Sequence, residues 1–265
     1  MHSHQSVHWI PILAYHRVVP AISEPDPFGN CVSLPMFKSH LRWLKRLGYA
    51  SVSLDAIAAL AADPECQLAL PRRSVAITFD DGYQDNHDYA LPALVEYGFS
   101  ATVFLVSGAI GGDNQFDRAN TSERVPMLTV GQIQKMHRVG FIFGSHTRSH
   151  PSNLMDLPGE SAALEIRLSR EEIEAIVQDP VHHFSYPYTR VNSRLENQVR
   201  EAGYRSACAG VGTAFTQFRL SRVWAPERRG PGLIIQMGMR RAKHMARQIL
   251  PLADERLADR RFSAQ

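Results

Sequence analysis

One short stretch, Ser74 to Tyr83 (SVAITFDDGY), limits what this chain can fold into more than any other. Its apolar residues lead directly into two adjacent carboxylates, Asp80 and Asp81, and Gly82 then allows the backbone to turn. A β-branched and aromatic run that ends in Asp-Gly is typical of a buried strand and its exit turn. Two acids at the end of a buried strand cost free energy unless a cation compensates them, so the stretch predicts a metal ion at this point.

Strand-like and helix-like segments alternate along the chain. The predicted strands cover residues 9–15, 74–79, 101–106, 141–144, 182–186, 205–209 and 218–223, and the predicted helices cover 35–47, 53–62, 91–97, 129–138, 161–177 and 193–202. Alternation of this kind in a chain of 265 residues predicts an α/β fold with a parallel sheet, closed or nearly closed into a barrel. The sequence contains no G-x-G-x-x-G turn after its first strand and no P-loop lysine motif, which argues against a nucleotide-binding sheet.

Polar residues follow several of these strands at the point where each strand ends. They are His16, Asp80 with Asp81, the segment 145–150 and the turn 186–188. In barrels of parallel strands the chemistry lies on the loops at the carboxyl ends. We therefore expect these groups, which are far apart in the sequence, to lie on one face of the protein.

The segment that follows the strand 141–144 holds two histidines, His146 and His150, four residues apart. On one helical turn their rings would point the same way, close enough to share an ion. Two imidazoles and one carboxylate make three ligands and leave a fourth position for water, as in a catalytic zinc site. The alternative, solvated loop histidines, is disfavoured by the Asp-Asp-Gly turn at another strand end.

Three motifs in this order, TFDDGY, SHTRSH and FSYPY, resemble those of the polysaccharide deacetylases with a NodB-type domain, carbohydrate esterase family 4. The segments AYHRV and ATVFLV agree, and the resemblance covers roughly residues 10–225. It implies a distorted (β/α) barrel of about seven parallel strands. It also implies a divalent metal, usually zinc, and removal of an acetyl group from an N-acetylated sugar in a polysaccharide or oligosaccharide.

The resemblance implies roles for single residues as well. Asp81, His146 and His150 resemble the metal ligands, Asp80 resembles the general base, and the backbone N–H of Tyr188 resembles the oxyanion donor. A metal lowers the pKa of water from about 15.7 towards 7. A carboxylate beside it can then accept the proton of that water.

Three further residues, Tyr83, Tyr186 and Pro187, are expected to contact the substrate. For the turn 186–188 the alternative is an apolar turn that packs the rim of the barrel.

The sequence departs from the family pattern at several positions. Ser185 stands where the family has an arginine that orients the base, and Thr189 stands where it has a glycine. Arg222, near the end of the last predicted strand, is the candidate substitute for that arginine, and a structural salt bridge is the alternative. No clear Leu-x-His segment, which supplies the family's general acid, follows Arg222. His16 is our hypothesis for that acid or for a substrate contact, against a hydrogen-bonding role at the rim.

These departures leave two other functions open. An O-acetyl esterase acting on a glycan needs a weaker acid, because an alkoxide leaves more readily than an amine. A catalytically inactive relative that binds a glycan or a protein partner is the second alternative.

The last part of the chain differs in charge from the rest. We expect residues 1–225 to form the barrel domain and 226–265 to form a basic helical extension. The net charge is +5 from Pro226 to Arg261 and −2 in the rest of the chain. A basic amphipathic helix can lie on an anionic membrane surface, and packing on the barrel is the alternative.

Composition adds a few exclusions. The overall charge of +3 is too small to predict nucleic-acid binding. Three scattered cysteines predict no disulfide framework. The sequence shows neither a signal peptide nor a run of about 18 apolar residues, so we expect a cytoplasmic protein. The oligomeric state is not predicted.

Overall fold

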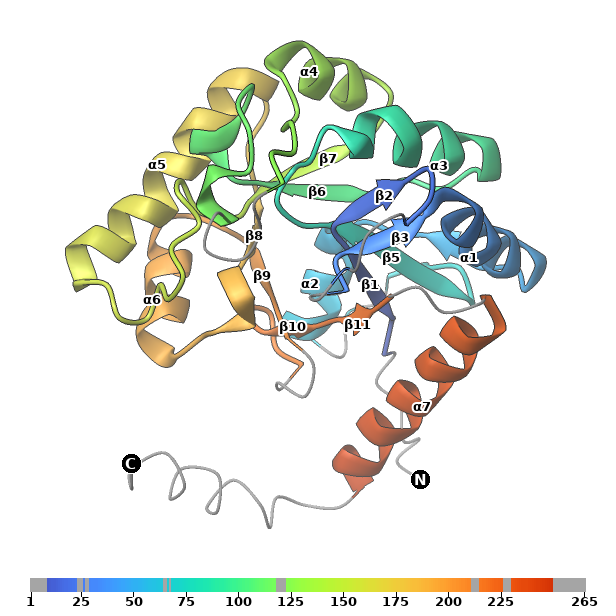
Figure 1. Ribbon diagram of the computed structural model, residues 1–265. Helices are drawn as coiled ribbons and strands as arrows, with labels where there is room; N and C mark the ends of the chain where they lie inside the picture. The colour runs from blue at the N-terminus through green and yellow to red at the C-terminus, as the bar shows by residue number, and fades with distance from the viewer. Residues whose placement is uncertain are drawn as a thin grey trace.

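The computed structural model describes residues 9–22, 26, 29–63, 66, 68–117, 123–210, 215–225 and 230–249, and Figure 1 shows a ring of strands with helices around it. Eight strands follow one another in the order β10-β9-β8-β7-β6-β5-β1-β11, and β4 pairs with β5 beside this path. All these pairs are parallel. The strands are β1 (Ile12–Tyr15), β4 (Ala50–Ser51), β5 (Ser74–Phe79), β6 (Thr102–Leu105), β7 (Ile142–Ser145), β8 (His183–Ser185), β9 (Ser206–Ala209), β10 (Leu220–Ser221) and β11 (Val223–Trp224). The predicted α/β barrel is confirmed, with eight strands along the path.

The two ends of this sheet meet at Arg222. β10 pairs with β9, and β11 pairs with β1 at the opposite edge of the sheet. The prediction of one continuous strand over 218–223 was wrong, because the chain changes its pairing partner at Arg222. The barrel is therefore nearly closed, and Arg222 lies in the seam, which is the junction between β10 and β11.

Helices cover the outside of the sheet, and their ends follow local sequence signals. They are α1 (Leu34–Arg46), α3 (Leu91–Tyr97), α4 (Val130–Arg138), α5 (Gly159–Val177) and α6 (Ser193–Glu201). The helix α2 (Leu54–Ala62) differs, because its Leu54 and Ile57 pack against side chains from the inside of the barrel. The Ser53 hydroxyl accepts a hydrogen bond from the backbone N–H of Ala56 at 3.3 Å, and Thr129 forms a capping box with Gln132. These caps confirm the predicted starts of α2 and α4. A small separate sheet, β2 (Arg17–Val19) with β3 (Cys31–Ser33), was not predicted.

Alternate residues of the strands fill the interior of the barrel. All of β5 is buried, and its Val75, Ile77 and Phe79 belong to the outer core under the helices. Ala76 instead belongs to an inner cluster, whose other strand residues are Ile12, Phe104, Cys208 and Leu220. Because successive side chains of a strand point to opposite faces, Asp80 continues the inward row that Ala76 begins. The pleat of β5 thus aims this carboxylate into the barrel.

Outside the barrel, α7 (Gly230–Ile249) packs against α1. Leu233 and Met237 are buried, and a Cβ on Gly230 would lie 2.2 Å from Cδ1 of Trp43, so the two helices touch closely. α7 belongs to the stretch predicted as an extension, of which 226–229 and 250–265 lie outside the described residues. Within the described residues, no helix has the length and apolar character needed to cross a membrane.

Candidate metal and catalytic site

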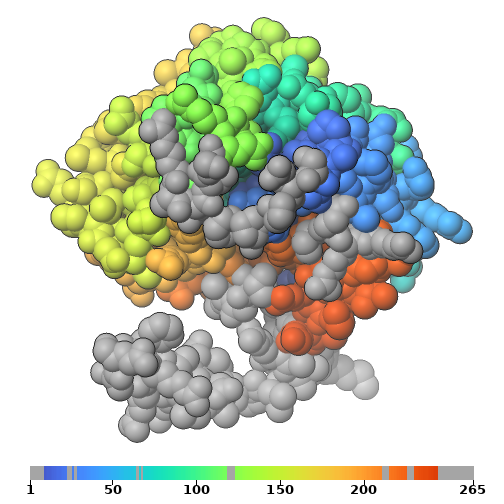
Figure 2. Space-filling view, in the orientation of Figure 1, coloured from blue at the N-terminus to red at the C-terminus, as the bar shows by residue number. Residues whose placement is uncertain are grey.

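A cavity of about 420 Å³ opens at the carboxyl ends of the strands. Figure 2 shows a hollow near the centre of this face, between the blue N-terminal and green central segments. Eight of the ten predicted site residues line the cavity: His16, Asp80, Asp81, His146, His150, Tyr186, Tyr188 and Arg222. The fold therefore brings together groups that lie up to two hundred residues apart in the chain.

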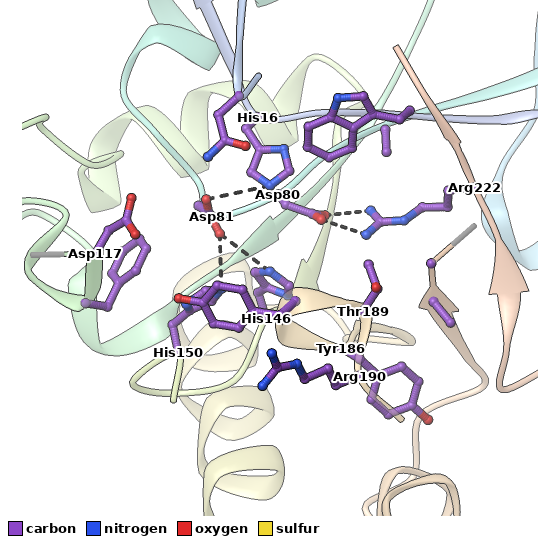
Figure 3. A pocket seen from close by; sticks show the side chains of 17 residues that line it. His16, Asp80, Asp81, Asp117, His146, His150, Tyr186, Thr189, Arg190 and Arg222 are labelled. Carbon is purple, nitrogen blue, oxygen red and sulfur yellow. Dashed lines mark hydrogen bonds and ion pairs between the residues drawn. The ribbon is translucent and has the colours of Figure 1, made fainter. Parts of the chain in front are cut away.

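The two aspartates diverge because the backbone turns sharply after β5. Asp81 has a φ of 73° and Gly82 a φ of 83°, so two successive residues are left-handed. That conformation is costly for a residue with a side chain and is common at functional sites. A Cβ on Gly82 would lie 2.6 Å from Cδ2 of Leu105, so any other residue there would have to displace the Leu105 side chain and would also strain the left-handed backbone. The turn leaves Asp80 facing into the barrel and brings Asp81 towards the two histidines (Figure 3).

Asp81, His146 and His150 present one ligand atom each, and these atoms all lie within 4.8 Å of one another. The Nε2 atoms of His146 and His150 lie 3.5 Å and 3.6 Å from Oδ1 of Asp81 (Figure 3). Two ligands that each lie about 2.1 Å from a tetrahedral zinc ion are about 3.4 Å apart. The spacing of these three side chains thus matches a shared metal ion.

The hydrogen bonds of the cluster also fit a metal site. Nδ1 of His146 lies 2.7 Å from the carbonyl oxygen of Ser185, which can only accept, so Nδ1 carries the hydrogen and Nε2 offers its lone pair. Oδ1 of Asp81 is buried and has no hydrogen-bond partner among the described residues. Burial and the neighbouring carboxylates of Asp80 and Asp117 raise the pKa of Asp81. Burial lowers the pKa of both histidines, so a divalent cation would find two neutral imidazoles here.

The histidines do not lie on a helical turn, and that prediction was wrong. Residues 146–150 are non-helical, with left-handed φ values of 68° at Thr147 and 54° at His150. The turn is held from α5, where the carboxylate of Glu165 accepts hydrogen bonds from the backbone N–H of Arg148 at 3.0 Å and from Ser149 N–H and Oγ at 2.8 Å each. Within the turn, the hydroxyl of Thr147 accepts a hydrogen bond from the N–H of His150 at 3.1 Å. A tight loop therefore achieves the convergence that the spacing suggested for a helix.

Arg222 holds Asp80 in a bidentate ion pair. Nη1 donates to Oδ1 and Nη2 to Oδ2, at 2.7 Å each, and both side chains are only 4% exposed. Burial acts to raise the pKa of Asp80, but the Arg222 guanidinium outweighs it and holds that pKa below its usual range. Nη2 also donates to the hydroxyl of Ser185 at 3.1 Å. The guanidinium thus reaches the position where the family has its arginine.

His16 lies on the other side of Asp81. Its Nε2 is 4.0 Å from Oδ2 of Asp81, and its ring centroid is 4.9 Å from that of Trp224. Burial lowers the pKa of His16 to about 4. Its Nδ1 is buried and finds no hydrogen-bond partner in the described part of the chain. The ring borders the cavity and has a polar atom available.

The turn after β8 carries two left-handed residues in succession, Tyr188 at φ 52° and Thr189 at φ 60°. Glycine, which the family has at the second of these positions, adopts such a conformation without strain. The Tyr188 ring is exposed and lies 4.9 Å from the His150 ring. The Tyr186 ring is fully buried and packs edge-on against Phe184, pointing away from the aspartates (Figure 3).

Two residues predicted to contact the substrate do not line the cavity. Pro187 is buried in the turn after β8. Tyr83 is buried in a small cluster with Val125 and Met127, because the loop after β6 covers it. Their predicted contacts with the substrate stay predictions.

The sequence did not single out several residues that line the cavity. Phe116, Asp117, Arg190 and Trp224 belong to this group. Phe116 and Asp117 come from the polar, Gly-rich segment that follows β6. The Phe116 ring centroid lies 4.8 Å from that of His150, so His150 contacts both the Phe116 and the Tyr188 ring.

Comparisons with known proteins agree with this geometry. The family model for polysaccharide deacetylases matches residues 68–207. YxkH of Bacillus subtilis, whose name assigns it to the polysaccharide deacetylases, is 29% identical over 199 residues, which are 74% of this chain and 62% of YxkH. The chain thus spans less than two thirds of that relative. The poly-β-1,6-N-acetyl-D-glucosamine N-deacetylase of Staphylococcus epidermidis is 28% identical over 213 residues, 72% of this chain and 68% of that protein.

Solved structures show the same fold. The deacetylase PplD of Streptococcus pyogenes, in complex with acetate, superposes with a TM-score of 0.69 at 24% identity, covering 86% of this chain and 96% of PplD. IcaB from Ammonifex degensii gives a TM-score of 0.69 at 20% identity, covering 88% of this chain and 96% of IcaB.

Proposed function

This chain belongs to the polysaccharide deacetylase family, and from that premise we propose that it hydrolyses the acetyl group of an N-acetylated saccharide. One observation carries the proposal: a single cavity holds the cluster of Asp81, His146 and His150 beside the ion pair of Asp80 and Arg222. We propose zinc as the metal, because one carboxylate and two imidazoles form a typical catalytic zinc set.

Each residue around the cavity has its own role in the proposed hydrolysis. When bound, the cation would act as a Lewis acid that polarises the acetyl carbonyl and lowers the pKa of water. Asp80 accepts the proton of the attacking water, and Arg222 keeps that carboxylate ionised and fixed in orientation. The backbone N–H of Tyr188 donates to the developing oxyanion. Burial lowers the pKa of His16 to about 4, so its ring is neutral in the free site; it takes up the proton that Asp80 accepted from water and passes it to the nitrogen of the breaking C–N bond, so that acetate and a free amine are released.

For the substrate, we propose a saccharide that contains N-acetylglucosamine. The name of the Staphylococcus epidermidis relative supports this class of substrate. The cavity of about 420 Å³ is bordered by Phe116, Tyr188 and Trp224, whose rings offer apolar surface to the face of a sugar.

Acetate release tests the proposal. Purified protein is incubated with oligomers of β-1,6-linked and β-1,4-linked N-acetylglucosamine, with zinc or with a chelator. We expect zinc-dependent acetate release from at least one of them. Asp80→Asn should lower turnover by about 10²- to 10⁴-fold while metal content is unchanged, whereas Asp81→Asn should lose both. Turnover by the Asp80→Asn protein at the wild-type rate would refute the assignment.

His16 is tested separately, because its role is a hypothesis of its own. His16→Ala should lower turnover steeply and leave metal content unchanged. Unchanged turnover would dismiss His16 as the proton donor, without affecting the metal site.

The absence of a clear Leu-x-His segment after Arg222 supports a second candidate, an O-acetyl esterase acting on a glycan. An O-acetylated glycan in the same panel distinguishes the two. Ester cleavage without amide cleavage would favour the esterase. Metal binding without release of acetate from any substrate would indicate an inactive, glycan-binding relative.

A further inference from the structure

Helix α7 is apolar on two opposite sides. Leu233 and Met237 are 1% and 2% exposed on the side that packs on the rest of the protein, whereas Ile235 and Met239 are 62% and 54% exposed. An α-helix advances about 100° per residue, so Ile235 and Met239 lie about 40° apart and about 160° from Leu233 and Met237 respectively. The two exposed side chains therefore form an outer strip that faces away from the barrel.

The same helix is strongly basic. From Gly230 to Ile249 the sequence contains no acidic residue and four basic ones, Arg240, Arg241, Lys243 and Arg247. Lys243 lies one turn beyond Met239 and is exposed, as is Arg241. The outer strip is therefore followed, at its C-terminal end, by the positive charge of Lys243.

The contact with α1 fixes which side of α7 faces outward. Gly230 lies against Trp43 so closely that a Cβ would be 2.2 Å from the indole Cδ1. Leu233 and Met237 continue this contact into the core. Figure 1 shows α7, in red, along the outside of the barrel beside β11. The Arg46 guanidinium lies 5.4 Å from the Trp43 ring, which places a further cation beside the start of α7.

We propose that α7 binds the surface of a membrane that contains anionic lipids. Ile235 and Met239 enter the boundary between headgroups and acyl chains, and Lys243, which continues their side of the helix, binds a headgroup phosphate. Arg240 and Arg241 lie about 100° and 160° around the helix from Met239, so they add positive charge near the surface without belonging to the strip. A helix with an exposed apolar strip, a lysine at the end of that strip and no acids fits this surface. A nucleic acid would use the charges and leave the apolar strip without a partner.

Sedimentation with vesicles tests the proposal on the full chain. One set contains phosphatidylcholine alone, and the other contains phosphatidylcholine with about one third phosphatidylglycerol. We expect binding to the anionic vesicles at low ionic strength and a steep loss as salt rises, because surface charge is screened. Equal binding to both sets, or no binding to either, would overturn the proposal.

Two variants locate the contact. A basic residue beside an anionic surface is worth about fivefold in binding, so Arg240→Gln/Arg241→Gln/Lys243→Gln should weaken binding at least about fivefold, which is the share of Lys243. Ile235→Ser/Met239→Ser should weaken it about tenfold. Wild-type binding by both variants would also overturn the proposal. The thermal midpoint and the helical circular dichroism should match the wild type, because these side chains lie outside the core.

The end of α4 offers a matched control. Lys135, Arg138 and Val139 are exposed there and combine charge with an apolar side chain in the same way. The variant Lys135→Gln/Arg138→Gln/Val139→Ser should bind vesicles like the wild type.

Light scattering tests whether a second copy of the chain covers the outer strip instead. A dimer that the Ile235→Ser/Met239→Ser variant dissociates would assign the outer strip to a second copy and overturn the membrane contact. No substrate is used, so the outcome is independent of the proposed deacetylase activity.

Discussion

Loss of the Arg222 guanidinium should leave the buried carboxylate of Asp80 without an opposite charge. Replacing Arg222 with Gln removes two charge-assisted hydrogen bonds of 2.7 Å and leaves the carboxylate of Asp80, which is 4% exposed, without its cation. Breaking one partner of a buried pair costs about 3–5 kcal/mol, so we expect Arg222→Gln to lose about 4 kcal/mol of unfolding free energy. In urea this corresponds to a midpoint lowered by more than about 1 M.

A double-mutant cycle separates the ion pair from general damage. Unfolding is followed in urea with a chelator present, for the wild type, Arg222→Gln, Asp80→Asn and the double variant. Because the double variant leaves no buried charge unpaired, it should be less destabilised than the sum of the single variants by about 2–3 kcal/mol. Additivity within about 0.5 kcal/mol would refute the reasoning.

An exposed pair of the same length provides the control. Arg167 and Glu171 on α5 are also 2.7 Å apart, but their side chains are 50% and 54% exposed. Water screens such a pair, so the same cycle should give a coupling below about 0.5 kcal/mol. A coupling there as large as that of Asp80 and Arg222 would show that burial is not the cause.

Three further predictions concern the metal cluster and its supports. Zinc at a thousandfold excess over its dissociation constant should raise the unfolding free energy by about 4 kcal/mol, an effect that Asp81→Asn abolishes and Asp80→Asn keeps, as calorimetry can measure. Glu165→Ala should weaken zinc binding about tenfold in a competition assay, because the histidine turn loses its support from α5, whereas Glu171→Ala on the same helix should not. Thr189→Gly should raise the free energy of unfolding by about 1 kcal/mol, measured as a higher urea midpoint, because it relieves a left-handed φ of 60°; a lower midpoint would contradict this.

The sequence was sufficient where local chemistry decides the structure. The run SVAITF is buried throughout as β5, and the period of two along a strand accounts for the inward direction of Asp80. Ser53 and Thr129 cap the helices that follow them, because their hydroxyls accept hydrogen bonds from the first helical turn. These features depend on neighbours within a few residues, which a single sequence displays.

The sequence was insufficient to predict the structure where residues far apart in the chain determine the backbone conformation. The spacing of His146 and His150 is the same in a helical turn and in the loop that the structure has. The loop is selected by left-handed residues such as Thr147 and by Glu165, which comes from α5 and accepts three hydrogen bonds. Phe116 reaches His150 through a long loop whose path no periodic pattern records. The residue types of the metal cluster could therefore be predicted from the sequence, but the backbone conformation that positions them could not.

The departure at Ser185 illustrates how a barrel can keep a group in space while moving it in sequence. Ser185 on β8 pairs with Cys208 on β9, which pairs with Leu220 on β10, so these three residues lie in one layer of the sheet. Arg222 comes two residues after Leu220 and extends from the seam to both Asp80 and Ser185. Inward rows from different strands converge on the same axis, so an arginine on β8 and one in the seam can reach the same carboxylate. The loss of a motif residue is thus not by itself evidence of a lost site, because the charge on Asp80 responds to the atoms around it and not to the strand that supplies them.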